Sequence, residues 1–91
     1  MASSASSKKR IRQNEKRRLR NRAYRSAMRT GIKQFRAAVE AADGDLARRR
    51  FAAVARRLDK LVSKGVIHKN QAARRKSRLA GQLSALNSAD S

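Results

Sequence analysis

Apolar side chains recur at intervals of three and four residues in three separate runs of this 91-residue chain, and the chain contains no proline. That spacing places the apolar side chains on one face of an α-helix, whereas a half-buried strand would alternate apolar and polar residues. The absence of proline removes the strongest interruption of a helix. The sequence therefore predicts an all-α fold.

Glycines and helix-capping residues divide the chain into three expected helices. The first ends at the Asp43-Gly44 turn, the second starts at the N-cap Asp45 and closes at Gly65, and Asn70 is the expected N-cap of the third. In order, the expected elements of this single domain are a flexible end over residues 1–7, helices over 8–42, 45–64 and 70–86, and a flexible tail over 87–91.

The apolar seams predict how these helices pack. Short connections make neighbouring helices antiparallel, and seams of this kind pack against one another as a bundle. The expected architecture is a three-helix, up-down-up bundle. The seam residues are Tyr24, Met28, Gly31, Phe35, Ala38 and Ala42 in the first helix, Ala47, Phe51, Val54, Leu58 and Leu61 in the second, and Ala72, Leu79, Leu83 and Leu86 in the third.

The first helix loses its apolar face towards its start. The seam continued backwards from Tyr24 meets Arg20 and Arg17 instead of apolar residues. The part before Tyr24 is therefore expected to project beyond the bundle as an arm of roughly 24 Å, at ~1.5 Å per residue. A stripe of arginines is expected on this helix roughly opposite its seam, at Arg18, Arg22, Arg25, Arg29 and Arg36.

Positive charge dominates the composition. Lysine and arginine number 25 against 6 aspartates and glutamates, which gives a net charge of +19 at pH 7. Self-repulsion of this size works against compaction, and a polyanion relieves it while releasing its own counterions. Aromatic residues make up only 3% of the chain, which argues against base stacking. Recognition of the backbone and shape of structured RNA is the expected mode.

The basic residues form two patches, and each is an expected phosphate-binding surface. Glu15 is the only acid between Lys8 and Arg25, whereas an ordinary solvated helix face mixes both signs. In the second patch Arg74 and Arg78 point away from the seam, and Lys76 is expected to extend out of it. Patches on separate helices predict contact with more than one RNA segment. The candidates are Lys8, Lys9, Arg10, Arg12, Lys16, Arg17, Arg18, Arg20, Arg22 and Arg25, together with Lys69, Arg74, Arg75, Lys76 and Arg78.

Several polar residues have two interpretations. A structural hydrogen bond and an RNA contact are both open for His68, whereas packing is favoured over base stacking for Tyr24. Ser77 can donate to a phosphate or to its own helix. The consecutive arginines 48–50 either contact RNA or are solvated, and the Ser-rich start is expected to be a frayed terminus rather than a transit peptide.

The sequence contains few residues of the kinds that catalysis requires. The chain has one histidine, no cysteine, no paired carboxylates on one helix face, no metal-ligand spacing and no glycine-rich phosphate loop. No enzymatic activity, cofactor, metal or small-molecule substrate is therefore expected. A DNA-binding or nucleoid-associated module is the alternative, disfavoured because the long first helix carries the charge rather than a short recognition helix. A membrane-active helix is disfavoured because the arm has almost no apolar face.

Two stretches resemble a known family. "NEKRRLRN" with the following "RSAMRT", and "GVIHKN.AAR.KSRL" further on, look like the bacterial small-subunit ribosomal proteins numbered twenty in that subunit's series. The resemblance covers about residues 8–86. It implies a helical bundle with an extended first helix, no homo-oligomer, and a place on cytoplasmic rather than organellar ribosomes. It also implies direct binding to 16S ribosomal RNA, in the 5′ domain and the long stem near the 3′ end, and a role in assembly.

The resemblance also assigns RNA-facing positions. They carry over to Lys9, Arg10, Arg12, Lys16, Arg17, Arg18, Arg22, Arg25 and Arg29 in the first helix, and to His68, Lys69, Asn70, Arg74, Lys76, Ser77 and Arg78 in the third.

Overall fold

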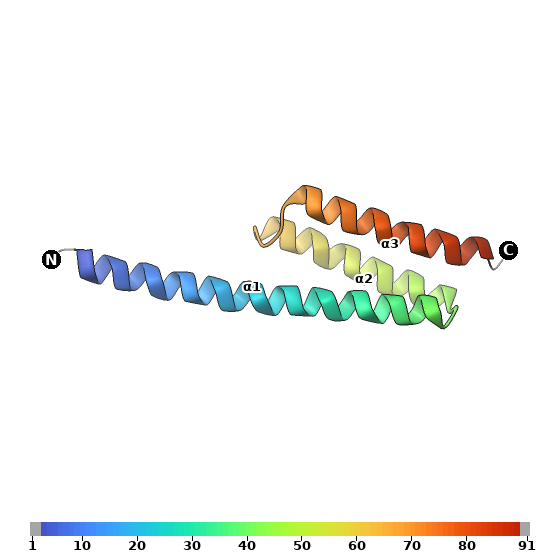
Figure 1. Cartoon of the computed structure of the whole chain (residues 1–91), viewed down its shortest axis with the longest axis horizontal. Helices are drawn as coiled ribbons and strands as arrows, with labels where there is room; N and C mark the ends of the chain where they lie inside the picture. The colour runs from blue at the N-terminus through green and yellow to red at the C-terminus, as the bar shows by residue number, and fades with distance from the viewer. Residues whose placement is uncertain (1–2, 90–91) are drawn as a thin grey trace.

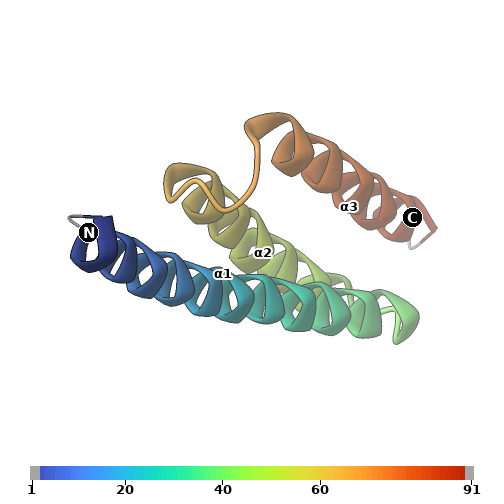
Figure 2. The ribbon, with the colours of Figure 1, turned by 60° about the vertical axis from the view of Figure 1, so that its left-hand side comes forward.

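The computed structural model of the protein describes residues 3–89, which form three α-helices joined by two short loops (Figure 1). Helix α1 spans Ser3–Glu40, α2 spans Gly44–Ser63 and α3 spans Lys69–Ala89. Helix α2 lies between α1 and α3 in both views (Figures 1 and 2). The expected all-α bundle and its long first helix are confirmed.

Helix α2 supplies the centre of the core. Its Leu58 and Leu61 are almost completely buried, as is Phe35 of α1. The rings of Phe35 and Phe51 lie 6.1 Å apart and pack at a tilt. A Cβ at Gly31 would come within 3.3 Å of Val54 Cγ2, so the glycine lets α1 and α2 approach closely. The buried residues are Met28, Ile32, Phe35, Ala38, Ala47, Val54, Leu58, Leu61, Val66, Ile67, Ala72 and Leu79.

The observed core differs from the expected seams in a few places. Ile32, Val66 and Ile67 are buried although the seams did not include them. Ala42, which was expected in the first seam, is exposed because it lies beyond the end of α1. Other expected members at the margins, Tyr24, Phe51, Leu83 and Leu86, are only partly buried.

The first half of α1 forms the arm (Figure 1), since every residue over 6–20 is exposed and Met28 is the first buried residue after them. The radius of gyration is 18.1 Å, against about 12 Å for a compact chain of this length. The helix begins at Ser3, before the expected residue 8, because neither glycine nor proline interrupts residues 3–7. Helix α3 likewise continues past residue 86 to Ala89. Residues 1–2 and 90–91 of the expected flexible ends lie outside the described range.

The end of α1 is a left-handed cap on an alanine. Ala42 has φ 56°, its N–H donates to the Val39 carbonyl, and the Asp43 N–H donates to the Ala38 carbonyl, both at 3.0 Å. These two bonds make a Schellman motif, which usually places glycine at the left-handed position. The helix was expected to run to Ala42 because the nearest glycine is Gly44. This expectation was wrong, because Ala42 itself takes the left-handed position.

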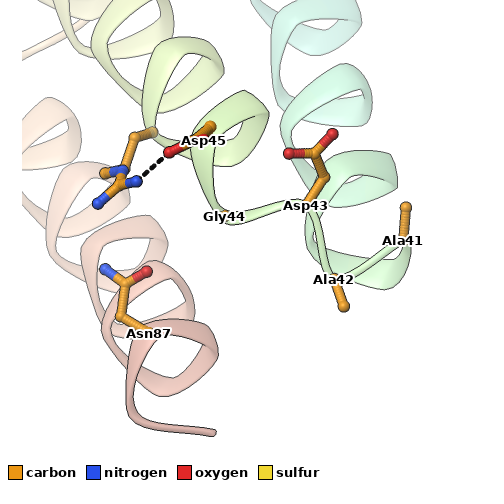
Figure 3. Close-up of a pocket in the computed structure, with 7 residues that line it drawn as sticks. Ala41, Ala42, Asp43, Gly44, Asp45 and Asn87 are labelled. Atoms are coloured by element: carbon orange, nitrogen blue, oxygen red, sulfur yellow. Dashed lines mark hydrogen bonds and ion pairs between the residues drawn. The ribbon is translucent and has the colours of Figure 1, made fainter. Parts of the chain in front are cut away.

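Helix α2 begins at Gly44, and its N-cap is Asp43 rather than the expected Asp45 (Figure 3). The Asp43 carboxylate accepts a hydrogen bond of 3.1 Å from the Leu46 N–H. Asp45 lies in the first turn instead, where a negative charge complements the helix dipole. Asp43 and Asp45 both satisfy the same capping pattern, and the position of the preceding turn decides between them.

The loop between α2 and α3 is held by its apolar residues. Gly65 has φ 73° and closes α2 as expected, since its N–H donates to the Val62 carbonyl while the Val66 N–H donates to the Leu61 carbonyl. Val66 and Ile67 then turn into the core. The short loop is thereby fixed against the bundle.

His68, rather than the expected Asn70, is the N-cap of α3. Its Nδ1 accepts a hydrogen bond of 3.1 Å from the Asn70 N–H, and its carbonyl accepts from the Ala72 N–H. Of the two interpretations of His68, the structure shows the structural hydrogen bond. This bond needs an unprotonated Nδ1, because a protonated ring nitrogen cannot accept.

Replacing Ala42 by glycine is expected to stabilise the protein. Glycine adopts positive φ without the steric cost that alanine pays, so Ala42→Gly should raise the free energy of unfolding by about 0.5–1 kcal/mol. Urea unfolding followed by circular dichroism measures the change. The control is Ala37→Gly inside α1, which should lower it by about 1 kcal/mol. Loss of stability in both variants would contradict the left-handed cap.

The N-cap of α3 predicts how two substitutions of His68 change the free energy of unfolding. His68→Ala should lower the free energy of unfolding by about 1 kcal/mol, because the Asn70 N–H loses its acceptor. His68→Asn supplies another acceptor at the same place and should stay close to the parent protein. Thermal unfolding of the three proteins measures this. Equal losses in both variants would mean that the ring, and not its acceptor, supports α3.

The arm should open readily in the free protein. Lys8, Arg12, Lys16 and Arg20 follow one another at intervals of four residues, and each like-charge pair costs a helix about 0.2–0.5 kcal/mol. Among the described residues no ion pair of the arm opposes this repulsion, and the arm's helix depends on its own backbone bonds. Amide hydrogen exchange should therefore be fast over residues 12–20 and slow around Leu58. Equal protection of the two regions would contradict this reasoning.

Candidate nucleic-acid interface

Arginines from α1 and α3 border one shared groove. Each of these helices packs on α2, and they contact each other much less. The space left between them is a hollow of about 260 Å³, in which the buried Ile32 and Leu79 form an apolar floor. The polar residues that line it are Arg36, Gln71, Arg74, Arg75 and Arg78.

The groove continues along α1 towards the arm. A second hollow of about 330 Å³ brings Arg25 and Arg29 of α1 opposite Arg75 of α3. Arg25 and Arg29 also line a third hollow, of about 530 Å³, with Arg18 and Arg22. Shared lining residues join the three hollows, so a row of arginines runs from the bundle onto the arm. We call the three hollows together the arginine groove.

The arginine stripe of α1 lies away from the apolar seam, as expected. At about 100° per residue, Arg18, Arg29 and Arg36 lie roughly 130° from the middle of the seam. Arg29 and Arg36 line hollows that α3 also borders. Of the first basic patch, Arg18, Arg22 and Arg25 border the same groove as Arg74 and Arg78. Contact with more than one RNA segment stays a prediction.

Arg36 is the one arginine among the described lining residues of the groove that the candidate set did not include. It continues the arginine stripe seven residues after Arg29 and lies with the arginines of α3. The signal was present in the stripe itself. Its meaning depended on where α3 lies, which the spacing on one helix does not give.

None of the described residues that line the arginine groove is acidic. The acidic residues of α2 are engaged elsewhere, since Asp45 pairs with Arg48 and Asp59 pairs with Lys76. Guanidinium groups that lack a carboxylate partner and surround an apolar floor suit phosphate oxygens, which they can bind through two parallel N–H bonds. The groove is therefore built to accept an anionic chain.

Some arginines also hold the protein together. Arg25 donates to the Val66 carbonyl at 3.3 Å and ties the second loop to α1, while Arg57 donates to the Ala27 carbonyl at 2.8 Å and ties α2 to α1. A guanidinium has five N–H donors. Arg25 therefore keeps donors for a ligand while it fixes the loop.

Lys76 differs from its expected role. Its ammonium forms an ion pair with Asp59 across the α2–α3 interface, and its side chain is 35% exposed. Lys76 occupies the position in the α3 seam where an apolar residue is missing, and there it pairs with Asp59 of α2 instead of extending into solvent. The structure therefore gives Lys76 a packing role, and its contact with RNA stays a prediction.

The remaining α3 candidates lie away from the groove. By helical geometry Lys69, Asn70 and Ser77 are exposed on other sides of α3. Tyr24 is partly buried against the core, and the Lys64 ammonium lies 5.4 Å from the centre of its ring, which agrees with packing rather than stacking.

The arm presents its basic residues on all sides. A shallow hollow brings Lys9, Arg12 and Lys16 together on one of them. Ile11 and Leu19 are exposed by 57% and 65%, so the arm carries two large apolar side chains that the charge pattern obscured. The exposed arm candidates are Lys8, Lys9, Arg10, Arg12, Lys16, Arg17, Arg18, Arg20 and Arg22.

Within residues 3–89, no cluster of three or more histidine, cysteine, aspartate or glutamate side chains could hold a metal ion. None of the three described helices has a stretch apolar and long enough to cross a membrane.

Comparison with known proteins shows which family the chain belongs to. A family model described as ribosomal protein S20 matches residues 2–84. The chain is 57% identical over 83 residues to small ribosomal subunit protein bS20 of Mycolicibacterium vanbaalenii, covering 91% of this chain and 96% of that protein. The protein of the same name from Thermobifida fusca is 59% identical over 83 residues, covering 91% and 90%. For the protein from Halalkalibacterium halodurans the identity is 51% over 78 residues, covering 86% of each. The resemblance of the two sequence stretches is thus confirmed, and the chain belongs to the ribosomal protein S20 family.

Proposed function

We propose that this protein is a structural constituent of the small ribosomal subunit that binds 16S ribosomal RNA directly in the cytoplasm. The observation that carries the proposal is the arginine groove, whose described lining includes no acid and which continues onto an exposed basic arm. Membership of the ribosomal protein S20 family supports it. No catalytic step is assigned to the chain.

The groove would act by neutralising phosphates. RNA strands that approach each other in a folded molecule repel, and arginines placed between them replace diffuse counterions with fixed ones. Arg36 and Arg78 face each other from two helices, so a strand in the groove would be contacted from both sides. Holding such strands together stabilises the folded RNA during and after assembly.

The arm would extend this contact to a deeper part of the RNA. Its exposed basic residues point in all directions around the helix, as suits a rod surrounded by phosphates. We propose the 5′ domain and the long stem near the 3′ end of 16S ribosomal RNA as the segments bound. Binding by shape and backbone fits the scarcity of aromatic residues.

The DNA-binding alternative has less support. The most basic helix is a 38-residue rod, and its groove-side arginines face α3 rather than standing free to enter a major groove. Folded RNA, with strands close together, fits this groove better than a straight duplex does.

Removing the charge of two groove arginines should weaken RNA binding in a salt-dependent way. The double variant Arg74→Gln/Arg78→Gln should reduce the slope of log affinity against log salt by about 0.7–0.9 for each phosphate that is no longer neutralised. Glutamine keeps the helix propensity close to that of arginine. Filter binding to 16S ribosomal RNA over a range of salt concentrations measures the slope.

The matched control removes the same charge elsewhere. Arg48 and Arg50 already have partners in Asp45 and Gln34, so Arg48→Gln/Arg50→Gln should change the slope much less. An equal change in both double variants would show that only total charge matters. Equal affinity of the parent protein for duplex DNA at the same nucleotide concentration would contradict the ribosomal proposal.

A further inference from the structure

We infer that the outward face of α2 is a second RNA-binding surface, which contacts a phosphate backbone on the opposite side of the bundle from the arginine groove. The inference rests on the proposed function and extends it to residues outside the groove. The surface consists of Arg49, Arg56 and Lys60, and we call it the α2 stripe.

The stripe points away from the core. Arg56 follows the fully buried Ala47 by nine residues, and Arg49 precedes the fully buried Leu58 by nine. Nine residues correspond to a turn of about 180° around the helix. Lys60 follows Arg56 by one turn. All three side chains are exposed. They therefore project from the side of α2 that neither α1 nor α3 covers.

The charge of the stripe is not compensated within residues 3–89. Each acid of α2 has a partner outside the stripe, because Asp45, one turn before Arg49, pairs with Arg48, and Asp59 pairs with Lys76 of α3. The pair at Asp45 is visible in Figure 3. No ion pair joins Arg49, Arg56 or Lys60 to a described acid. Three like charges along about 16 Å of helix, at ~1.5 Å per residue, favour an extended anion.

The neighbours of the stripe suit a close approach. Ala52 and Ala53 flank it and are exposed, so the helix backbone can come near a partner while the long basic side chains reach around it. The only large exposed apolar residues among those described, Ile11 and Leu19, both lie on the arm. A protein interface would need apolar or aromatic anchors on α2, and a membrane surface would need apolar side chains there. A phosphate backbone needs neither.

The groove and the stripe lie on different faces, so a single straight strand cannot contact both. The Cα trace measures only 21 and 13 Å across its long axis. Two RNA segments on either side of the bundle would therefore be brought close together, and the charges between them would reduce their repulsion. A contact on α2 would thus add an RNA segment on the side of the bundle opposite the arginine groove.

Site-directed cleavage can test the two faces separately. The chain has no cysteine, so Ala53→Cys beside the stripe and Gln71→Cys in the groove can each carry a tethered iron chelate that generates hydroxyl radicals. Bound to full-length 16S ribosomal RNA, the two probes should cut non-overlapping stretches. Cleavage from the groove alone, or of one common stretch from both positions, would overturn the inference and leave the proposed function intact. Cleavage from neither would contradict the proposed function.

A charge variant supplies the second measurement. Arg49→Gln/Arg56→Gln/Lys60→Gln should lower the salt slope by about 2–3 and remove the cleavage from position 53, while cleavage from position 71 persists. Arg48→Gln/Arg50→Gln is the control and should preserve both patterns. An unchanged slope, or cross-linking of position 53 to a protein instead of RNA in assembled subunits, would overturn the assignment. Circular dichroism of each variant checks that the bundle is folded.

Discussion

The burial of one face of α2 against two different helices is the constraint on which the other features depend. Large apolar side chains are few, and the best of them, Leu58 and Leu61 of α2 with Phe35 of α1, meet at the centre. Because α1 and α3 both pack on α2 and not extensively on each other, a groove remains between them. A fuller core would have closed that groove. The modest apolar content therefore creates the surface on which the arginines converge.

Much of this arrangement was predictable from periodicity, and the errors came from information that periodicity lacks. The spacing of Met28, Phe35 and Leu58 gave the helices and most of the core correctly. The cap positions were misassigned, since several residues near each helix end satisfy the same local pattern and only the tertiary turn selects one. His68 is an example, because its role as N-cap depends on where the buried Ile67 places the chain.

The candidate site was predictable in composition but not in arrangement. Spacing on one helix gave the stripe that contains Arg29 and Arg36, and spacing on another gave Arg74 and Arg78. That these residues border one groove follows from the way in which α2 orients its two neighbours. The role of Lys76 was hidden for the same reason, as its partner Asp59 lies on another helix. Charge patterns thus identify the ligand class, whereas packing assigns residues to faces.

Continuity of α1 links the two parts of the proposed RNA contact. The helix runs without interruption from the arm through the groove, so Arg18 on the arm and Arg36 in the bundle lie on one continuous helix. A strand docked in the groove fixes the direction of that axis, and Arg25 fixes the adjacent loop through the Val66 carbonyl. The arm's entry into RNA is then an intramolecular step with less orientational entropy to lose. In the other direction, phosphates around the arm offset the repulsion that destabilises its helix, and the ordered arm in turn positions the groove.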